Sequence, residues 1–368
     1  MSQIIKRSFH STLKRYDVIT TVCPGQGNVN PHLFTLTQYQ IDILNNYKYR
    51  NILQQVQETL PDINIIKYFS KKTYPDSSII TDELSKTSIV QPLVLLSTIL
   101  NYSIFKDIYD WDVNNSNYML GHSLGELSSL VLQDVISFEN GLKIAYKRGK
   151  LMEDAILNYN IKSKNDIINN NNNNQSWGMV ALMFQERDFR SVLKVCDDIK
   201  LNIANINGYG QIVVSGKTDE LNLKLAKLNE IQQQLLLAKR WKSRIRKTWL
   251  QTKIPAHHPV FDDIKEELRS MIHLKSDILY IPVVCNLNGL VVVKNSQRVV
   301  DNFIDVTSKP VKFVDCLESI VPFDSDKDEL YKFLNVSDVT HGLIKRFFNN
   351  NKNVQSYDLI AEAEKELV

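Results

Sequence analysis

The sequence has little net charge and lacks a long uninterrupted apolar run. Its 44 lysines and arginines nearly balance 41 aspartates and glutamates, which leaves a net charge of +3 over 368 residues. So small an excess gives no support for nucleic acid or an anionic membrane as the main partner. The most apolar stretch, residues 89–104, is interrupted by polar residues and a proline, and a membrane-spanning helix needs roughly 20 apolar residues. We therefore expect no nucleic-acid partner and no transmembrane segment.

Cysteine is also scarce. Cys23, Cys196, Cys285 and Cys316 form neither a C-x-x-C pair nor a metal-ligand spacing. They are predicted to be buried thiols of a protein in a reducing compartment, and no metal site is expected. With 43% hydrophobic and 23% charged residues, the composition excludes disordered and fibrous classes. At roughly 150 residues per domain, the length predicts two structural units, or one large unit that carries an insertion.

The first sixteen residues differ in composition from the rest. They contain Lys6, Arg7, Lys14 and Arg15 among serines and threonine, and the first acidic residue is Asp17. This pattern is typical of a mitochondrial transit peptide, which is amphipathic and rich in basic residues. We predict a transit peptide over residues 1–16 and a location in the mitochondrial matrix. The alternative is an ordinary frayed basic terminus.

The first half of the chain has an α/β pattern. The apolar residues 18–23 stop at Pro-Gly-Gln-Gly, as a buried parallel strand entering a turn should. A buried helix is predicted from Pro92, with the proline in its first turn. Residues 118–120 are predicted to be a short strand and residues 126–132 the helix that follows it.

A run of six asparagines, Asn169 to Asn174, marks a boundary. Such a tract cannot bury a core, so residues 166–175 are predicted to be a solvated loop. The elements predicted beyond it are a strand (179–184), a helix (188–196), two strands (201–206 and 212–215), a helix (220–236) and a strand (248–253). This βαββαβ order is that of a ferredoxin-like domain.

The residues that follow are predicted to belong again to the large α/β part. A strand is predicted over residues 278–284, a hairpin turn at Asn288-Gly289, and helices over residues 314–320 and 343–348. The sequence thus predicts an α/β protein with a small inserted domain. The domain bounds are residues 17–165 and 254–350 for the large part, 176–253 for the small part and 351–368 for a C-terminal tail.

The sequence Gly121-His122-Ser123-Leu124-Gly125 fits the G-x-S-x-G motif, a serine on a sharp turn between strand and helix. Such a serine projects at the helix N-terminus, where N–H groups stabilise developing negative charge. It needs a general base, which is most often histidine. His257 and His258 follow a predicted strand, and from the residues alone either could serve.

Taken together, these segments resemble malonyl-CoA:acyl-carrier-protein transacylases over residues 21–348. The matching segments are residues 24–27, 91–92, 121–126, 148–152, 204–207, 211–216, 255–259 and Asn286. The resemblance implies an α/β-hydrolase-like large subdomain with a ferredoxin-like insertion. It also implies transfer of a malonyl group from malonyl-CoA to the phosphopantetheine thiol of an acyl carrier protein, with no metal and no cofactor.

The resemblance assigns roles to individual residues. Ser123 would be the nucleophile and His257 its base, while the backbone N–H groups of Gln26 and Leu124 would form the oxyanion hole. Arg148 would bind the malonyl carboxylate through two parallel hydrogen bonds. Two further polar residues, Gln91 and Asn207, would line the pocket.

The chain departs from the family pattern at three places. Val306 stands where the family often has glutamine, a residue whose main-chain carbonyl orients the histidine. Ala256 precedes the histidine, where members with strict malonyl preference often have a bulkier residue or serine. Residues 335–337 replace a late glycine-proline-glycine signature.

An acidic carrier protein would need a basic docking surface. A basic run precedes the strand that leads to His257 and consists of Lys239, Arg240, Lys242, Arg244, Arg246 and Lys247. We predict that this run docks the carrier, and we expect a monomer.

Two other functions remain open. A serine esterase or thioesterase would use the same serine but needs an acid between serine and histidine in the chain, and an acyl-binding module would not react at all.

Overall fold

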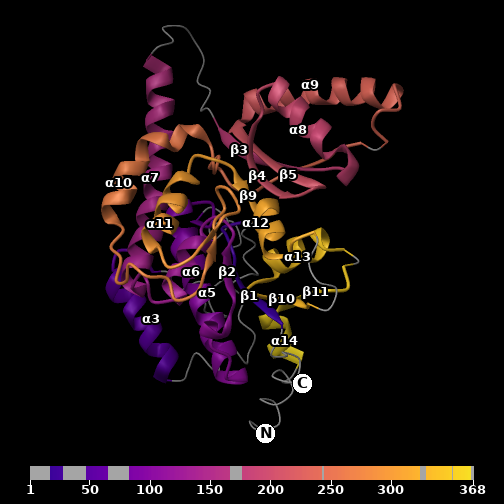
Figure 1. Cartoon of the computed structure of the whole chain (residues 1–368). Helices are drawn as coiled ribbons and strands as arrows, with labels where there is room; N and C mark the ends of the chain where they lie inside the picture. The colour runs from indigo at the N-terminus through magenta and orange to yellow at the C-terminus, as the bar shows by residue number, and fades with distance from the viewer. Residues whose placement is uncertain are drawn as a thin grey trace.

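The computed structural model describes residues 17–27, 47–64, 83–165, 176–242, 244–323, 329–349 and 351–365 of the chain. The predicted transit peptide (residues 1–16) and asparagine-rich loop (residues 166–175) lie outside the described residues. The described part is a mixed α/β protein with one six-stranded and one five-stranded sheet (Figure 1). The α/β fold class predicted from the sequence is confirmed.

The six-stranded sheet has the order β11-β10-β1-β2-β7-β8, and every neighbouring pair except β7 and β8 is parallel. Its strands are β1 (Val18–Cys23), β2 (Tyr118–Gly121), β7 (Val283–Val284), β8 (Val291–Val292), β10 (Tyr331–Asn335) and β11 (Val354–Asp358). The helices in the described part of this larger body are α3 (Tyr47–Thr59), α5 (Thr87–Tyr109), α6 (Gly125–Leu132), α7 (Phe138–Asn165), α10 (Lys265–Met271), α11 (Ser296–Asp305), α12 (Phe313–Ile320), α13 (Asp338–Phe347) and α14 (Leu359–Lys365). The short 3-10 helices η3 (Val113–Asn115) and η5 (Pro259–Ile264) are described there too.

The hairpin predicted at Asn288-Gly289 joins β7 to β8. Gly289 has a φ of +69°, and a Cβ at this position would lie 2.7 Å from the backbone of Asp315, so glycine is required there. The strand predicted over residues 278–284 is wrong in its first part, since only the last two residues form β7. Pro282 has no N–H to donate, and the Ile281 N–H bonds the side chain of Gln133 instead of a strand.

Helix α5 is buried over most of its length and packs along α7. It begins at Thr87, so the prediction that Pro92 lies in its first turn is wrong. The carboxylate of Glu153, on α7, accepts hydrogen bonds from the N–H (2.8 Å) and the hydroxyl of Ser88 and so holds the actual first turn. By length and composition α5 could cross a bilayer, but 72% of its most apolar window is buried in the protein.

The five-stranded sheet has the order β6-β3-β5-β4-β9. Its chain order is β3 (Trp177–Met183), η4 (Glu186–Asp188), α8 (Phe189–Asp198), β4 (Asn202–Gly208), β5 (Gln211–Lys217), α9 (Thr218–Leu237) and β6 (Arg246–Trp249), with β9 (Val311–Lys312) added from the larger body. The first four strands and two helices follow the βαββαβ order. β6 lies earlier than the predicted residues 248–253 because β3 pairs with residues 246–249. Because β9 pairs in parallel with β4, the two bodies share a sheet edge.

The smaller sheet presents two different faces because successive side chains of a strand alternate. From β3, Val180 and Leu182 pack with the helices α8 and α9, which cover the upper side of this sheet in Figure 1. Met179 and Ala181 point the other way and pack near Ala256, in the loop that follows β6. The face of the smaller sheet that carries Met179 and Ala181 forms one wall of the region described next.

The C-terminal residues extend the fold beyond the predicted bound at residue 350. β11 pairs in parallel with β10, and α14 follows it and contacts α5. The sequence predicts a tail here, but its described part, residues 351–365, belongs to the larger sheet and its helices. The four cysteines are free and buried, as predicted.

Candidate active site

The predicted serine turn lies between β2 and α6. Ser123 has a φ of +54°, a left-handed conformation that is uncommon for a residue with a side chain. A Cβ on Gly121 would lie 2.1 Å from the Glu126 nitrogen, and one on Gly125 would lie 2.3 Å from the Cys23 carbonyl oxygen. The two glycines of the motif are therefore required by close backbone approach, and the serine side chain stands at the N-terminal end of α6.

His257 lies beside this serine. Its Nε2 is 2.9 Å from Ser123 Oγ, and its Nδ1 bonds the main-chain carbonyl of Val306. A carbonyl can only accept, so Nδ1 carries the proton and Nε2 is left to accept from the serine hydroxyl. Valine at position 306 thus keeps the orienting contact, because the contact comes from the main chain.

The surroundings keep His257 neutral. The imidazole is only 2% exposed, and burial lowers its pKa to about 3. The Val306 carbonyl opposes this shift, while the charges of Arg148 and His122 add to it. At neutral pH the ring is an unprotonated base, as proton abstraction from serine requires.

The two neighbouring histidines, His122 and His258, are engaged elsewhere. His258 accepts the Val260 N–H at Nδ1 and so begins η5. The Nε2 of His122 is 2.9 Å from Oδ1 of Asn207 on β4. Of the two histidines between which the residues alone could not choose, His257 is the one within hydrogen-bond distance of Ser123 Oγ.

One cavity of about 290 Å³ brings the predicted site residues together. It is lined by all seven of them, Gln26, Gln91, Ser123, Leu124, Arg148, Asn207 and His257. Leu124 directly follows the serine and precedes α6, and Gln26 lies in the loop after β1, so main-chain groups of both flank the nucleophile. Among the described residues, no group of three or more His, Cys, Asp or Glu side chains could hold a metal ion.

Arg148 is a buried cation in the wall of this cavity. It is 2% exposed, its Nε donates to Thr307 Oγ1 (3.3 Å), and its guanidinium lies 5.2 Å from the Phe303 ring centre. Burial lowers its pKa to about 10, and the nearby Glu126 carboxyl opposes this shift. The arginine is therefore still charged at neutral pH. A charge held in this way in a cavity wall fits an anionic ligand.

The two polar lining residues have different surroundings. Gln91 is fully buried, its Nε2 contacts Met152 Sδ at 3.5 Å, and its Oε1 has no hydrogen-bond partner in the described part of the chain. Asn207 uses its Oδ1 to hold His122. Gln91 thus has an acceptor to offer a ligand, whereas Asn207 ties the serine turn to the smaller sheet.

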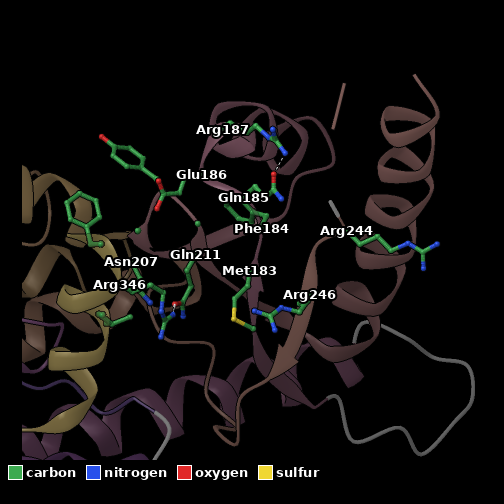
Figure 2. Close-up of a pocket in the computed structure, with 15 residues that line it drawn as sticks. Met183, Phe184, Gln185, Glu186, Arg187, Asn207, Gln211, Arg244, Arg246 and Arg346 are labelled. Atoms are coloured by element: carbon green, nitrogen blue, oxygen red, sulfur yellow. Dashed lines mark hydrogen bonds between the residues drawn. The ribbon is translucent and has the colours of Figure 1, made fainter. Parts of the chain in front are cut away.

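A second cavity, of about 1040 Å³, adjoins the first and shares Asn207, Gln211, Leu343 and Arg346 with it. Figure 2 shows Arg246 directed toward Met183 within this cavity and Arg346 beside Gln211, whereas Arg244 points away. Sequence reasoning missed Arg346, which lies about 100 residues from the basic run along the chain. Nothing local in the sequence indicates that the two regions meet.

The predicted basic run is not one surface. Four of its members, Lys239, Arg240, Lys242 and Arg244, are exposed, and Arg246 is exposed at the second cavity. Lys247 instead turns toward α9, where its ammonium donates to the Leu225 carbonyl at 3.2 Å. The run therefore divides into exposed residues, of which Arg244 and Arg246 line the second cavity, and Lys247, which bonds to α9.

No family model matches the chain. Comparison with curated proteins finds similar sequences that are named malonyl CoA-acyl carrier protein transacylases. The malonyl CoA-acyl carrier protein transacylase of Staphylococcus aureus (strain MSSA476) is 29% identical over 311 residues, which are 82% of this chain and 85% of that protein. The polyketide biosynthesis malonyl CoA-acyl carrier protein transacylase of Bacillus subtilis (strain 168) is 35% identical over 148 residues, 40% of this chain and 43% of that protein.

Solved structures share the fold. The acyl-carrier-protein-S-malonyltransferase of Bartonella henselae superposes with a TM-score of 0.70 at 18% identity, covering 95% of this chain and 99% of that one. The malonyl-CoA:acyl carrier protein transacylase of Xanthomonas oryzae gives a TM-score of 0.70 at 21% identity, covering 95% and 98%. Sequence likeness over most of both chains and a fold shared over nearly all of this one agree with the resemblance found in the motifs: the chain is similar to malonyl CoA-acyl carrier protein transacylases in both sequence and fold.

Proposed function

We propose that the protein transfers a malonyl group from malonyl-CoA to the phosphopantetheine thiol of an acyl carrier protein, in the service of fatty acid synthesis. The observation that carries this proposal is that the Ser123–His257 pair and the buried cation Arg148 line the same cavity. A nucleophile and a fixed positive charge in one small cavity suit an acyl group that ends in a carboxylate.

In the first half-reaction, Ser123 Oγ attacks the thioester carbonyl carbon while its proton passes to His257 Nε2. The developing oxyanion is held by the N–H groups of Gln26 and Leu124, and one such donor contributes about 3 kcal/mol in other enzymes. The carbon–sulfur bond then breaks, and the sulfur of coenzyme A takes the proton from His257. The products are free coenzyme A and a malonyl ester of the serine.

The second half-reaction runs the same steps in reverse with a different thiol. The carrier's thiol gives its proton to His257 and attacks the malonyl ester, and Ser123 recovers its proton as the ester bond breaks. Each step is a proton transfer or an addition and elimination at one carbonyl carbon, so the proposal includes no metal and no cofactor.

Acyl selection rests on Arg148. Among the described residues, the one hydrogen bond of the guanidinium is from Nε to Thr307, so its other N–H groups are left for a ligand. A malonyl carboxylate pairs with them, whereas an acetyl group would leave the buried charge unpaired, at a cost of about 1 to 3 kcal/mol.

We propose that the larger cavity receives the phosphate-bearing end of the pantetheine arm and that the exposed basic residues steer the acidic carrier. Arg346 lines both cavities, and Arg246 lines the larger one with its side chain directed toward Met183, while Arg244 points away (Figure 2). Arg246→Glu should therefore raise the KM for both malonyl-CoA and carrier, and Arg244→Glu that for carrier alone. Equal effects of the two substitutions on both substrates would contradict this division.

A serine esterase is the second candidate, and one contact bears on it. The Nδ1 of His257 bonds a main-chain carbonyl and not the carboxylate that a hydrolase triad would place there. This neutral partner favours the transferase.

The transfer is tested by mass spectrometry of the intact protein after brief mixing with malonyl-CoA. One malonyl adduct is expected on the parent, none on Ser123→Ala, and loss of the adduct on addition of a carrier protein. Free malonate accumulating without an acceptor would favour the esterase, and no reaction at all would favour an acyl-binding module.

We also propose that the protein acts as a monomer in the mitochondrial matrix. The basic, acid-free residues 1–16 support the location, and the monomer is proposed because Ser123, His257 and Arg148 all lie on the same chain, so a single copy supplies the nucleophile, the base and the cation. Fusing residues 1–16 to a fluorescent protein tests the first point, since a diffuse signal would contradict it. Light scattering on the purified protein tests the second.

A further inference from the structure

Asn286 lies directly behind the serine turn and is fully buried. Its Oδ1 accepts the Ser123 N–H at 2.6 Å, and its Nδ2 donates to the Gly121 carbonyl at 2.7 Å. The single amide group therefore bonds the peptide groups on both sides of His122. These are the peptide groups whose orientation sets the sharp turn.

The backbone of Asn286 is itself fixed from two directions. Its N–H donates to Glu126 Oε1 on α6 at 2.7 Å, and its carbonyl accepts the Lys312 N–H from β9 at 2.8 Å. Glu126 is also fully buried. Asn286 thus joins three elements, β7, α6 and β9, at the point where the nucleophile is presented.

Two properties of the site depend on this contact. The first is the backbone of Ser123, because a left-handed conformation of a residue with a side chain persists only when its surroundings hold it. The second is the Ser123 N–H, which is already bonded to Asn286 Oδ1 and so is not free to donate to an oxyanion. That arrangement leaves the N–H groups of Leu124 and Gln26 for the substrate.

We propose that Asn286 is a positioning residue for the transfer reaction, which holds Ser123 Oγ within reach of His257 Nε2. The inference rests on the proposed function for the identity of the substrate, whereas the positioning of Ser123 by Asn286 does not depend on that identity. An asparagine is suited to the place because it offers an acceptor and a donor in one plane. Aspartate supplies both only when it is protonated, and alanine supplies neither.

The test compares Asn286→Ala and Asn286→Asp with the wild type. The matched control is Asn288→Asp, because Asn288 is exposed, lies two residues away, and uses only an acceptor, for the Leu290 N–H, which aspartate keeps. Two rates are measured, the labelling of Ser123 by a fluorophosphonate, which needs no acyl-CoA, and steady-state malonyl transfer with its kcat and KM.

Asn286→Ala should lower both the labelling rate and kcat about 100-fold while leaving the KM for malonyl-CoA nearly unchanged, because misplacement of a reacting atom by about 1 Å has an effect of that size. Asn286→Asp should be less impaired at about pH 6 than at about pH 9, since only its protonated form can donate to the Gly121 carbonyl. Its rate is therefore expressed as a ratio to the wild type at each pH. The control should match the wild type throughout.

Three results would overturn the positioning role: labelling of Asn286→Ala at the wild-type rate, a change confined to KM, or an Asn286→Asp ratio that does not vary with pH. If the alanine variant does not fold, the aspartate variant, which has nearly the same shape, still gives the pH test. A wild type that is labelled by the probe and loses this labelling in Asn286→Ala, yet forms no malonyl adduct, would support the positioning role and refute the proposed function.

Discussion

Removal of Arg148 gives the sharpest test of acyl selection. In Arg148→Ala the malonyl carboxylate would enter a buried cavity without its cation. Loss of one partner of a buried charge pair costs about 3 to 5 kcal/mol, and 1.36 kcal/mol corresponds to tenfold in rate. The kcat/KM for malonyl-CoA should therefore fall roughly 10²- to 10⁴-fold, whereas that for acetyl-CoA should stay the same or rise.

The variant is expected to fold, because the group that Arg148 leaves behind can become neutral. Glu126 is buried, and burial already raises its pKa to about 8 against the opposing Asn286 N–H and Arg148 charge. Without the arginine this pKa moves further up, so the carboxyl is protonated at neutral pH and no unpaired charge remains.

The assay follows release of coenzyme A in a single turnover, with malonyl-CoA and acetyl-CoA measured in parallel on each variant. Arg148→Lys serves as the matched variant, because it keeps the charge but loses the planar pair of donors, and an intermediate loss is expected. An equal loss for both acyl groups would show that Arg148 only supports the fold, and no loss for either would show that the carboxylate binds elsewhere.

Three further predictions concern pH and packing. Because burial lowers the pKa of His257 to about 3, the acylation rate should show no inflection near pH 6.5, and a clear one there would contradict a neutral buried base. The raised pKa of Glu126 means that the folded protein binds a proton that the unfolded chain releases. The contribution of this group to stability, up to several kcal/mol, is therefore lost as pH rises from about 4.5 through about 8. The free energy of unfolding of Glu126→Gln, measured with denaturant, should lack this loss, and curves of unfolding free energy against pH that run parallel for the variant and the wild type would refute the prediction. Gly149→Ala places a Cβ 2.5 Å from the Ser88 backbone and should lower stability by about 1 to 3 kcal/mol. Gly342→Ala places a Cβ with nothing within 4 Å among the described residues and should raise stability by up to about 1 kcal/mol. A similar change in Tm for both variants would contradict the packing argument.

The elements that the sequence predicted well are those whose signals are local. β1 has the predicted bounds, and the serine turn follows from two glycines and a flanking strand and helix. The start of α5 was mispredicted because its first turn is held by Glu153, some 65 residues away. A partner so far along the chain overrides the usual placement of Pro92 in a first turn.

In the site, too, residues with a local sequence signal could be predicted, whereas those that depend on distant contacts could not. Ser123 is visible as a motif, but the residues alone could not choose between His257 and His258, because the choice depends on a distance across the fold. Asn286 was part of the resemblance without a role, since its contacts run to residues about 160 positions away. Arg346 gave no signal for the same reason.

The carbonyl partner of His257 has a consequence for the direction of the proposed reaction. Because Val306 offers a dipole and no full charge, it only partly offsets the effect of burial on the protonated ring, and the ring returns its proton readily to whichever sulfur leaves. Forward and backward transfer then meet similar barriers, and the protein acts as a two-way exchanger that brings the coenzyme A and carrier pools to equilibrium. Net flow is set by whatever reaction consumes the malonyl carrier.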